Sequence, residues 1–570
     1  MRKSSSVALT VAFIGGLGEV GKNLMVFGHG QDLLIVDCGI TFPRDEDPGV
    51  DVVLPDFTYL LENRDRLRGL VITHGHEDHL GGVPYLLKDL QVPIYGPGLA
   101  LGLLEDKLRE QGVKLPRGSR TFTPGEKLRV GCFDVEAFRV NHSIADTVGL
   151  AIDSPAGLVV HSGDFKFDQT PVDGNVADLQ RLAGYAERGV LALFSDSTNA
   201  DRPGFTPSEK TVGRVLDEIC QNAPGRIVVT TFASNVHRVQ QLLWSARRSG
   251  RQVALAGRSL ERTVEVASRL GYLEVPEGTV VDLEVANRLP DREVVLLTTG
   301  SQGEPLSALA RMANGEFRRA EVRRGDTVVI AATPVPGNER LVARTIDQLF
   351  RRGAEVVYEA HRGVHVSGHA SREELKLMIN LVRPRFFVPV HGHYRLLVRH
   401  AELAREVGMA EEDVAVVENG AVLEFTPERV REIGRVPADN VMVDGLGDVG
   451  SIVLRDRHQL AQEGVMVVFL VLDRQAGTIV AGPDIVSRGF VYTRESEELL
   501  DEARQKVTET LGRLGAGKLG DWPTVKGAIK DTLGRFLQER VGRKPVLLPL
   551  ILEVGDPLAT VRPRGGKSRQ

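Results

Sequence analysis

The sequence has few cysteines and no long apolar run. Its 570 residues include three cysteines, Cys38, Cys132 and Cys220. No two of them are close in sequence, which excludes a disulfide scaffold and a zinc ribbon held by cysteines. The longest unbroken apolar run, Val465–Leu472, has eight residues, whereas a membrane-spanning helix needs about 20. We therefore expect no membrane partner.

Aromatic residues and net charge are also low. Aromatic residues make up 5% of the chain, and 71 basic against 76 acidic residues give a net charge of −5. Because nucleic-acid-binding domains are usually basic, this balance permits a polyanionic partner without indicating one. The hydrophobic content of 42% is that of a globular protein, and the length corresponds to about three or four domains.

The N-terminus matches a signal peptide only in part. Met1–Lys3 is basic and Val7–Ile14 is apolar, but the chain then runs directly into Gly15 and Gly16. A small-residue cleavage pattern is missing. We interpret Val7–Ile14 as a first strand and expect a cytoplasmic protein.

The pattern of strands and helices changes along the chain. Short strands separated by Gly, Pro, Asn and Asp fill the first part. Strands then alternate with helices such as Asn235–Arg248, which predicts a parallel sheet. Short strands and loops return over Arg352–Thr426. We predict a split domain at 1–205 and 357–435, an inserted α/β domain at 206–356, a linker at 436–450, a small α/β domain at 451–560 and a basic tail at 561–570.

A glycine-rich segment near the N-terminus matches two nucleotide-binding motifs imperfectly. Gly16–Gly21 fits the dinucleotide fingerprint, with Asp37 near the expected acidic position, and Gly16–Lys22 approximates a P-loop. The fingerprint requires a crossover helix, but only 11 residues separate Gly21 from Leu33. We therefore expect a glycine-rich hairpin turn and no nucleotide cofactor.

Metal-binding residue types are concentrated after one predicted strand. The strand Leu70–Thr73 is followed by His74-Gly75-His76-Glu77-Asp78-His79. Imidazole and carboxylate groups suit Zn²⁺ and Mn²⁺. Because side chains alternate along extended backbone, His74 and His76 can face one metal, and a turn would direct Asp78 and His79 to a second. Further ligand types follow later strands, at His142, Asp164 and His391.

This H-x-H-x-D-H motif with a later His, Asp and His resembles the metallo-β-lactamase fold family. The resemblance implies an αβ/βα sandwich and two divalent metal ions, Zn²⁺ and/or Mn²⁺. It covers about Val7–Ala200 and Glu359–Thr426. It assigns one ion to His74, His76 and His142 and the other to Asp78, His79 and His391, with Asp164 bridging them.

The segment between Asp196 and His369 resembles the β-CASP module of nucleic-acid-processing members. Asp196 matches its first marker, and His369 matches its second. His391 matches its third, where a histidine accompanies RNA substrates and a valine DNA substrates. A DNA nuclease and a small-molecule metallohydrolase on the same fold remain alternatives, and so does a non-catalytic RNA-decay scaffold, although no ligand is missing.

Four further segments resemble the bacterial ribonuclease J family: Gly15–Asn23, Gly163–Asp168, Ser195–Ala200 and Thr299–Pro305. That resemblance implies 5′-to-3′ exonuclease activity on single-stranded RNA with a 5′ monophosphate, some endonuclease activity, and a role in mRNA decay and RNA maturation. It also implies a C-terminal dimerisation domain, hence a homodimer or homotetramer, and possible partners in the RNA-decay machinery. Asp51 and Asp444 resemble positions that hold an extra structural cation in some members.

The motifs also suggest individual roles. We expect catalysis to depend on Asp78, on His369 as the acid that protonates the leaving 3′ oxygen, and on Asp196 as a carboxylate that orients or tunes a metal-ligand histidine. For the 5′ phosphate we expect a pocket at a helix start, formed by Ser234, Asn235, His365, Val366, Ser367, Gly368 and His369.

Overall fold

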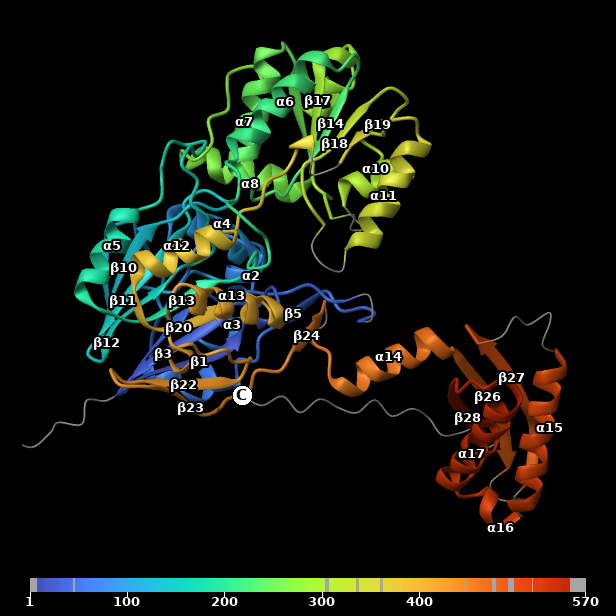
Figure 1. Ribbon diagram of the computed structural model, residues 1–570. Coiled ribbons are helices and arrows are strands. Elements are labelled where there is room, and N and C mark those ends of the chain that lie inside the picture. Colours follow the sequence, from blue (N-terminus) through green and yellow to red (C-terminus); the bar gives the residue numbers. More distant parts are fainter. Residues whose placement is uncertain are drawn as a thin grey trace, which may run out of the picture. The chain divides into compact units, whose positions relative to one another are not determined.

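The computed structural model describes residues 8–44, 47–302, 307–334, 338–358, 362–445, 447–473, 478–490, 497–514 and 516–553. These residues form two compact units, one drawn from 1–42 and 52–441 and the other from 43–51 and 442–570 (Figure 1). The predicted basic tail lies outside the described residues, as does part of the motif at Thr299–Pro305.

Two facing sheets form the centre of the first unit. The first sheet has the order β23-β22-β1-β3-β4-β6-β7-β8. Its strands are β1 (Leu9–Gly15), β3 (Leu24–His29), β4 (Asp32–Val36), β6 (Leu67–Val71), β7 (Ile94–Gly96), β8 (Arg120–Thr121), β22 (Ala421–Phe425) and β23 (Val430–Arg435). The strands β4, β6, β7 and β8 are parallel to one another.

The second sheet has the order β20-β13-β12-β11-β10-β9. Its strands are β9 (Lys127–Val130), β10 (Phe133–Arg139), β11 (Val148–Ser154), β12 (Gly157–His161), β13 (Val190–Asp196) and β20 (Pro384–Val390). The strand β13 pairs in parallel with both β12 and β20. The carboxyl ends of these three strands therefore meet at one edge of the sheet.

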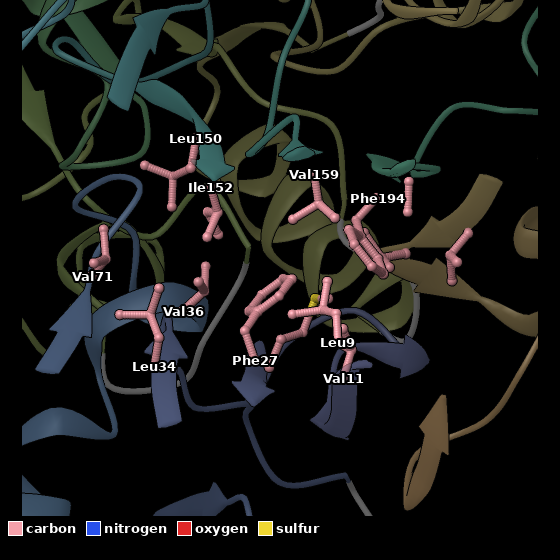
Figure 2. Packing of buried hydrophobic residues seen from close by; sticks show 14 of the residues in the cluster. Leu9, Val11, Phe27, Leu34, Val36, Val71, Leu150, Ile152, Val159 and Phe194 are labelled. Atoms are coloured by element: carbon pink, nitrogen blue, oxygen red, sulfur yellow. The ribbon is translucent and has the colours of Figure 1, made fainter. Parts of the chain in front are cut away.

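A continuous apolar core fills the space between the two sheets (Figure 2). Phe27 on β3 packs edge-to-face on Phe194 of β13, with ring centroids 5.4 Å apart. Strands buried on both faces read as nearly unbroken apolar runs, which is why β1 and β13 were recognisable in the sequence.

Helices cover the outer faces of both sheets, which completes the predicted αβ/βα sandwich. The first sheet packs against α3 (Val83–Asp89) and α4 (Gly98–Glu110). The second sheet packs against α5 (Leu179–Arg188), α12 (Arg372–Val382) and α13 (Tyr394–Glu406). We expected only short strands and loops over Arg352–Thr426, and that expectation is wrong for α12 and α13. Both helices present an apolar stripe to the sheet. Such a helix is recognised in a sequence only when apolar residues are sought at helical spacing.

The inserted domain has the parallel sheet that its strand–helix alternation predicts. Its order is β16-β15-β17-β14-β18-β19, and every pairing is parallel. The strands are β14 (Ile227–Thr230), β15 (Gln252–Ala256), β16 (Val280–Val281), β17 (Val294–Thr298), β18 (Thr327–Ile330) and β19 (Glu355–Val357). The helices are α6 (Lys210–Asn222), α7 (Val236–Arg248), α8 (Arg258–Arg269), α9 (Leu283–Ala286), α10 (Ala308–Asn314) and α11 (Glu339–Arg351).

The second unit contains a three-stranded sheet of order β27-β26-β28. It comprises α14 (Ser451–Glu463), β26 (Val465–Asp473), β27 (Thr478–Arg488), α15 (Glu497–Leu514), α16 (Ala516–Leu519), α17 (Trp522–Val541) and β28 (Val546–Glu553). One sheet face packs on α15 and α17. The segment 436–450, predicted as a linker, contains β24 (Val441–Asp444) and β25 (Gly447–Asp448), which pair with each other.

The glycine-rich segment near the N-terminus forms a turn between strands. β1 pairs antiparallel with β3 across it, and the short β2 (Leu17–Gly18) lies between them. Gly16 and Gly18 have φ values of 90° and 74°, which favour glycine. A strand therefore follows where the dinucleotide fingerprint would require a crossover helix.

Candidate metal centre

The first group of potential ligands joins three histidines and one aspartate. The ligand atoms of His74, His76, His142 and Asp164 all lie within 4.8 Å of one another. His76 Nδ1 is 3.0 Å from His74 Nε2 and 3.1 Å from His142 Nε2. Three ring nitrogens that converge on one point, next to a carboxylate, form a donor set that fits a divalent transition metal.

The second group consists of Asp78, His79, Asp164 and His391, whose ligand atoms also lie within 4.8 Å of one another. His391 Nε2 is 3.2 Å from Asp78 Oδ2. Asp164 Oδ2 is 3.3 Å from His79 Nε2 and 3.6 Å from His391 Nε2. The same oxygen is 3.7 Å from His74 Nε2, so one carboxylate oxygen belongs to both groups.

The sheet topology brings these residues together. His74 and His76 follow β6, and His76 precedes the first turn of α2 (Glu77–Leu80), which carries Asp78 and His79. In the other sheet, Asp164 follows β12, Asp196 ends β13 and His391 follows β20. Because β12, β13 and β20 are parallel, these three acidic or imidazole side chains emerge at one edge.

Hydrogen bonds to the outer ring nitrogens orient three of the histidines. His79 Nδ1 is 2.8 Å from Asp37 Oδ2, and His142 Nδ1 is 2.8 Å from the carbonyl oxygen of Gly368. His391 Nδ1 is 2.7 Å from Thr198 Oγ1. In each ring the engaged Nδ1 leaves Nε2 facing the cluster, which is the usual arrangement around metal-bound histidines.

Asp37 is a site residue that the sequence reasoning did not assign. The sequence placed it only near the acidic position of a dinucleotide fingerprint. The structure places it directly after β4, which is parallel to β6, so it shares a sheet edge with His74. Asp37 is only 2% exposed. Its position at the carboxyl end of an apolar strand close to the H-x-H-x-D-H motif is the signal that could have identified it.

Burial and mutual interactions favour neutral histidines in the first group. Burial lowers the pKa values of His74 and His142 well below the usual range, and it lowers the pKa of His76 to about 4. Neutral imidazoles are the form that binds metal.

Charge dominates in the second group. Burial opposes ionisation of Asp164, but the neighbouring His391 and His79 outweigh it and hold the pKa of the Asp164 carboxyl well below its usual range. Conversely, burial disfavours the charged forms of His79 and His391, but carboxylates, chiefly Asp164, raise their pKa values well above the usual range. The centre thus concentrates negative charge and attracts a cation, whether protons or metal ions.

His369 and Asp196 lie at the edge of this centre. Asp164, Asp196, His369 and His391 form a third convergent group. Asp196 Oδ2 is 2.8 Å from His369 Nδ1, and Asp196 Oδ1 is 3.3 Å from His391 Nδ1. The His369 side chain is 20% exposed, whereas that of Asp196 is 1% exposed. His369 is therefore the member of this group that solvent or a substrate can reach.

The residues predicted to form a phosphate pocket are partly brought together. Asn235 caps α7, where its side chain accepts a hydrogen bond from the Arg238 amide at 3.0 Å. Arg238 Nη1 also lies 3.1 Å from His365 Nδ1, so α7 contacts the segment His365–His369. Within the described contacts, Ser234 has no direct hydrogen bond to that segment.

Ser367 and Gly368 connect the segment to the metal centre. Ser367 Oγ accepts a hydrogen bond from Asn199 Nδ2 at 2.9 Å, and the Gly368 carbonyl contacts His142 as described above. Val366 is buried.

Asp51 and Asp444 lie in the second unit. Asp444 Oδ2 accepts a hydrogen bond from Arg457 Nη2 at 2.5 Å, and the Asp51 amide donates to the Val443 carbonyl at 2.9 Å. In the described part of the chain, neither residue belongs to a group of three or more metal-ligand types. An extra cation at these residues stays a prediction.

Comparisons with known families agree with this architecture. The metallo-β-lactamase superfamily model matches residues 17–198, and a "Zn-dependent metallo-hydrolase RNA specificity domain" matches residues 353–417. The fold and the convergent histidines define a metallo-β-lactamase-type hydrolase interrupted by an inserted domain. The "Ribonuclease J, beta-CASP domain" model matches residues 224–349 of that insertion, and the "Ribonuclease J C-terminal domain" model matches residues 452–554.

Full-length relatives extend the match. Ribonuclease J2 of Bacillus subtilis (strain 168) is 43% identical over 97% of this chain and 100% of its own length. Ribonuclease J of Synechocystis sp. is 45% identical over 98% of this chain and 88% of its own, and that of Thermus thermophilus is 42% identical over 95% and 94%. The chain belongs to the ribonuclease J family, and as such it is a metal-dependent enzyme that hydrolyses RNA.

A solved structure shares the fold. The crystal structure of a protein of unknown function from Enterococcus faecalis V583 has a TM-score of 0.52 and 16% sequence identity. The match covers 73% of this chain and all of that chain. At this identity the likeness shows the fold alone.

Proposed function

We propose that this protein is a 5′-to-3′ exoribonuclease that prefers single-stranded RNA with a 5′ monophosphate, that it also has endonuclease activity, and that it acts in mRNA decay and RNA maturation in the cytoplasm. The observation that carries the proposal is the pair of ligand groups that share Asp164 Oδ2, with the accessible His369 beside them.

His74, His76 and His142 would hold one divalent ion, either Zn²⁺ or Mn²⁺, and Asp78, His79 and His391 the other, with Asp164 contacting both. When bound, two such ions acidify water and neutralise charge on a phosphodiester. The outer hydrogen bonds from Asp37, Gly368 and Thr198 keep the ligand nitrogens in place.

His369 is the proposed general acid. Its Nδ1 is engaged by Asp196, so Nε2 is the ring nitrogen available to a substrate. An imidazole in this position can donate the proton that the leaving 3′ oxygen requires. Asp196 acts through His369 and His391, because its two carboxylate oxygens contact one ring each.

The terminal phosphate would bind between the start of α7 and the segment His365–His369. Free amide groups and the dipole at a helix start favour an anion, and Ser234, Asn235 and Ser367 supply polar groups there. Burial and the adjacent Arg238 guanidinium lower the pKa of His365 to about 3, so His365 serves as a neutral hydrogen-bonding group.

Assembly through the C-terminal domain is a further part of the proposal. The sheet face of β26–β28 that does not contact α15 and α17 exposes large apolar side chains, including Phe469, Leu548, Leu550 and Leu552. Exposed apolar surface of this kind is typical of protein interfaces, which supports a homodimer or homotetramer. Partners in the RNA-decay machinery are proposed on family grounds.

No helix in the described residues is long and apolar enough to span a membrane.

The decisive experiment follows a 3′-labelled single-stranded RNA that carries a 5′ monophosphate, triphosphate or hydroxyl, with Mn²⁺ and with an Asp78→Ala control. We expect preferential, progressive shortening of the monophosphorylated RNA and an inactive control. Equal internal cleavage of all three RNAs would contradict the exonuclease and phosphate-pocket proposals. If the RNA stayed intact while DNA or an ester was hydrolysed, the proposed substrate would be wrong.

A further inference from the structure

A cavity of about 450 Å³ lies between the inserted domain and the segment after β12. Helices α6 and α7 form two walls, and Thr170 and Val172 form the third. On α6, Lys210, Arg214 and Asp217 follow one another at intervals of four and three residues, so they share a helix face. On α7, Gln241, Trp244 and Arg248 are spaced by three and four residues, so they also share one helix face.

The close approach of the two helices depends on a glycine. A Cβ at Gly213 would lie 2.2 Å from Gln241 Oε1, so a side chain at this position would displace Gln241. Gln241 in turn donates from Nε2 to the Glu209 carbonyl at 3.1 Å. This part of the cavity lining is therefore held in place by contacts within the protein.

The cavity combines positive charge with an aromatic ring. Arg248 pairs with Asp217 at 2.5 Å. Lys210 and Arg214 are exposed, and within the described part of the chain neither has an ion-pair partner. Trp244 is half-buried in the wall. Thr170, Ser208 and Thr211 also line the cavity.

We infer that this cavity binds one nucleotide unit, with the base stacked on Trp244 and the phosphate between Lys210 and Arg214. Base–aromatic stacking and cationic phosphate contacts are the two interactions through which proteins hold single-stranded RNA without reading its sequence. A cavity of this size is within the range that small-molecule ligands occupy. The nucleotide can belong to an RNA strand or be a free mononucleotide.

The site is separate from the metal centre but connected to it through the backbone. None of the cavity residues belongs to the three ligand groups. The cavity wall at Ser208 and Lys210 lies a few residues beyond Thr206, whose hydroxyl donates to the His369 carbonyl at 2.7 Å. The backbone that carries this wall therefore also contacts the segment of His369. The inference does not depend on the proposed direction of degradation.

The test uses tryptophan fluorescence. The chain has two tryptophans, so a Trp522→Phe variant leaves Trp244 as the single emitter. In the full-length protein, with Asp78→Ala added to prevent hydrolysis, we would titrate a 5′-phosphorylated decaadenylate and, separately, AMP. Saturable quenching of Trp244 is expected. Quenching by the oligonucleotide alone identifies a site for an RNA strand, and quenching by AMP alone identifies a site for a free mononucleotide.

Charge variants supply the control. The double variant Lys210→Gln, Arg214→Gln should bind the ligand that quenches Trp244 at least tenfold more weakly. The double variant Lys210→Arg, Arg214→Lys keeps both positive charges and should retain the affinity. Arg318→Gln with Arg344→Gln, at exposed positions outside the cavity, should leave affinity unchanged.

For a strand, removing two phosphate contacts should also reduce the slope of log affinity against log salt by about 0.7 per contact. If the oligonucleotide binds by fluorescence anisotropy and neither ligand changes Trp244 emission, the inference is wrong. An unchanged affinity in the Lys210→Gln, Arg214→Gln protein would also overturn it.

Discussion

The carboxylate of Asp196 holds the ring of His369 through a 2.8 Å contact between Oδ2 and Nδ1, while its other oxygen contacts His391. One buried acid thus links the proposed proton donor to a proposed metal ligand. The role of His369 can still be separated from metal binding, because His369 is 20% exposed and lies outside the two main ligand groups, whereas His391 is buried and belongs to one of them.

A His369→Ala variant should lose about 10²- to 10³-fold in turnover, within the range that general acids contribute. Its content of divalent metal should stay at the wild-type value, since the two main ligand groups do not include His369. Steady-state kinetics and elemental analysis of the same preparation measure both quantities. Loss of metal in this variant would show that His369 is a ligand.

An Asp37→Asn variant should lower the affinity for the metal ion held by His79 by about 10- to 100-fold, as is typical when the hydrogen-bond partner of a ligand histidine is removed. The cause is loss of the carboxylate that engages His79 Nδ1. Competition with a chelator measures the affinity. Asp32→Asn, at the start of the strand that Asp37 follows and paired with Arg68, is the matched control, and equal affinities in the two variants would refute the role of Asp37.

A Gly368→Ala variant should disturb the first group of ligands, which includes His142. The added Cβ would lie 2.7 Å from His142 Nδ1 and 2.8 Å from the Ser143 amide, so His142 must move. We expect lower metal occupancy and lower activity, measured by elemental analysis and RNA hydrolysis. Gly184→Ala on α5, where nothing lies within 4 Å of the new Cβ, should preserve both. A fully metallated, active Gly368→Ala protein would contradict the prediction.

The ion pair of Arg238 with Glu209 should be important for stability. Two contacts of 2.8 Å join the groups, and both residues are buried. Removing one partner leaves an uncompensated buried charge, so Arg238→Met should lower the free energy of unfolding by about 3–5 kcal/mol. Adding Glu209→Gln should recover part of this loss. Urea denaturation measures both, and a single variant as stable as the wild type would contradict the prediction.

Stability should fall in mild acid because of His400. Burial lowers its pKa to about 3 in the folded protein, against about 6.5 when unfolded. Between these values the unfolded chain binds a proton that the folded protein does not, so stability decreases as the pH falls from about 6.5 towards 3. The contribution approaches about 1.4 kcal/mol per pH unit. In metal-free protein, His400→Gln should show a shallower dependence by that amount, and equal slopes would refute the assignment.

Much of the site could be read from local sequence. The H-x-H-x-D-H run is contiguous, so His74 and Asp78 were identifiable as ligand types by spacing alone. The buried strands were recognisable from their apolar runs, and the parallel sheet of the inserted domain from its strand–helix alternation. These features depend on residues that are neighbours along the chain, and that is why a sequence alone specifies them.

Other features were decided by tertiary structure. Asp37 reaches His79 because β4 and β6 are parallel neighbours, and Gly368 reaches His142 across 226 positions. The cavity beside Trp244 exists because Gly213 lets α6 approach Gln241 on α7. Local patterns indicate which residue types are present and in which elements. The packing of sheets and helices decides which of those residues meet, because these contacts join segments that are far apart in the chain.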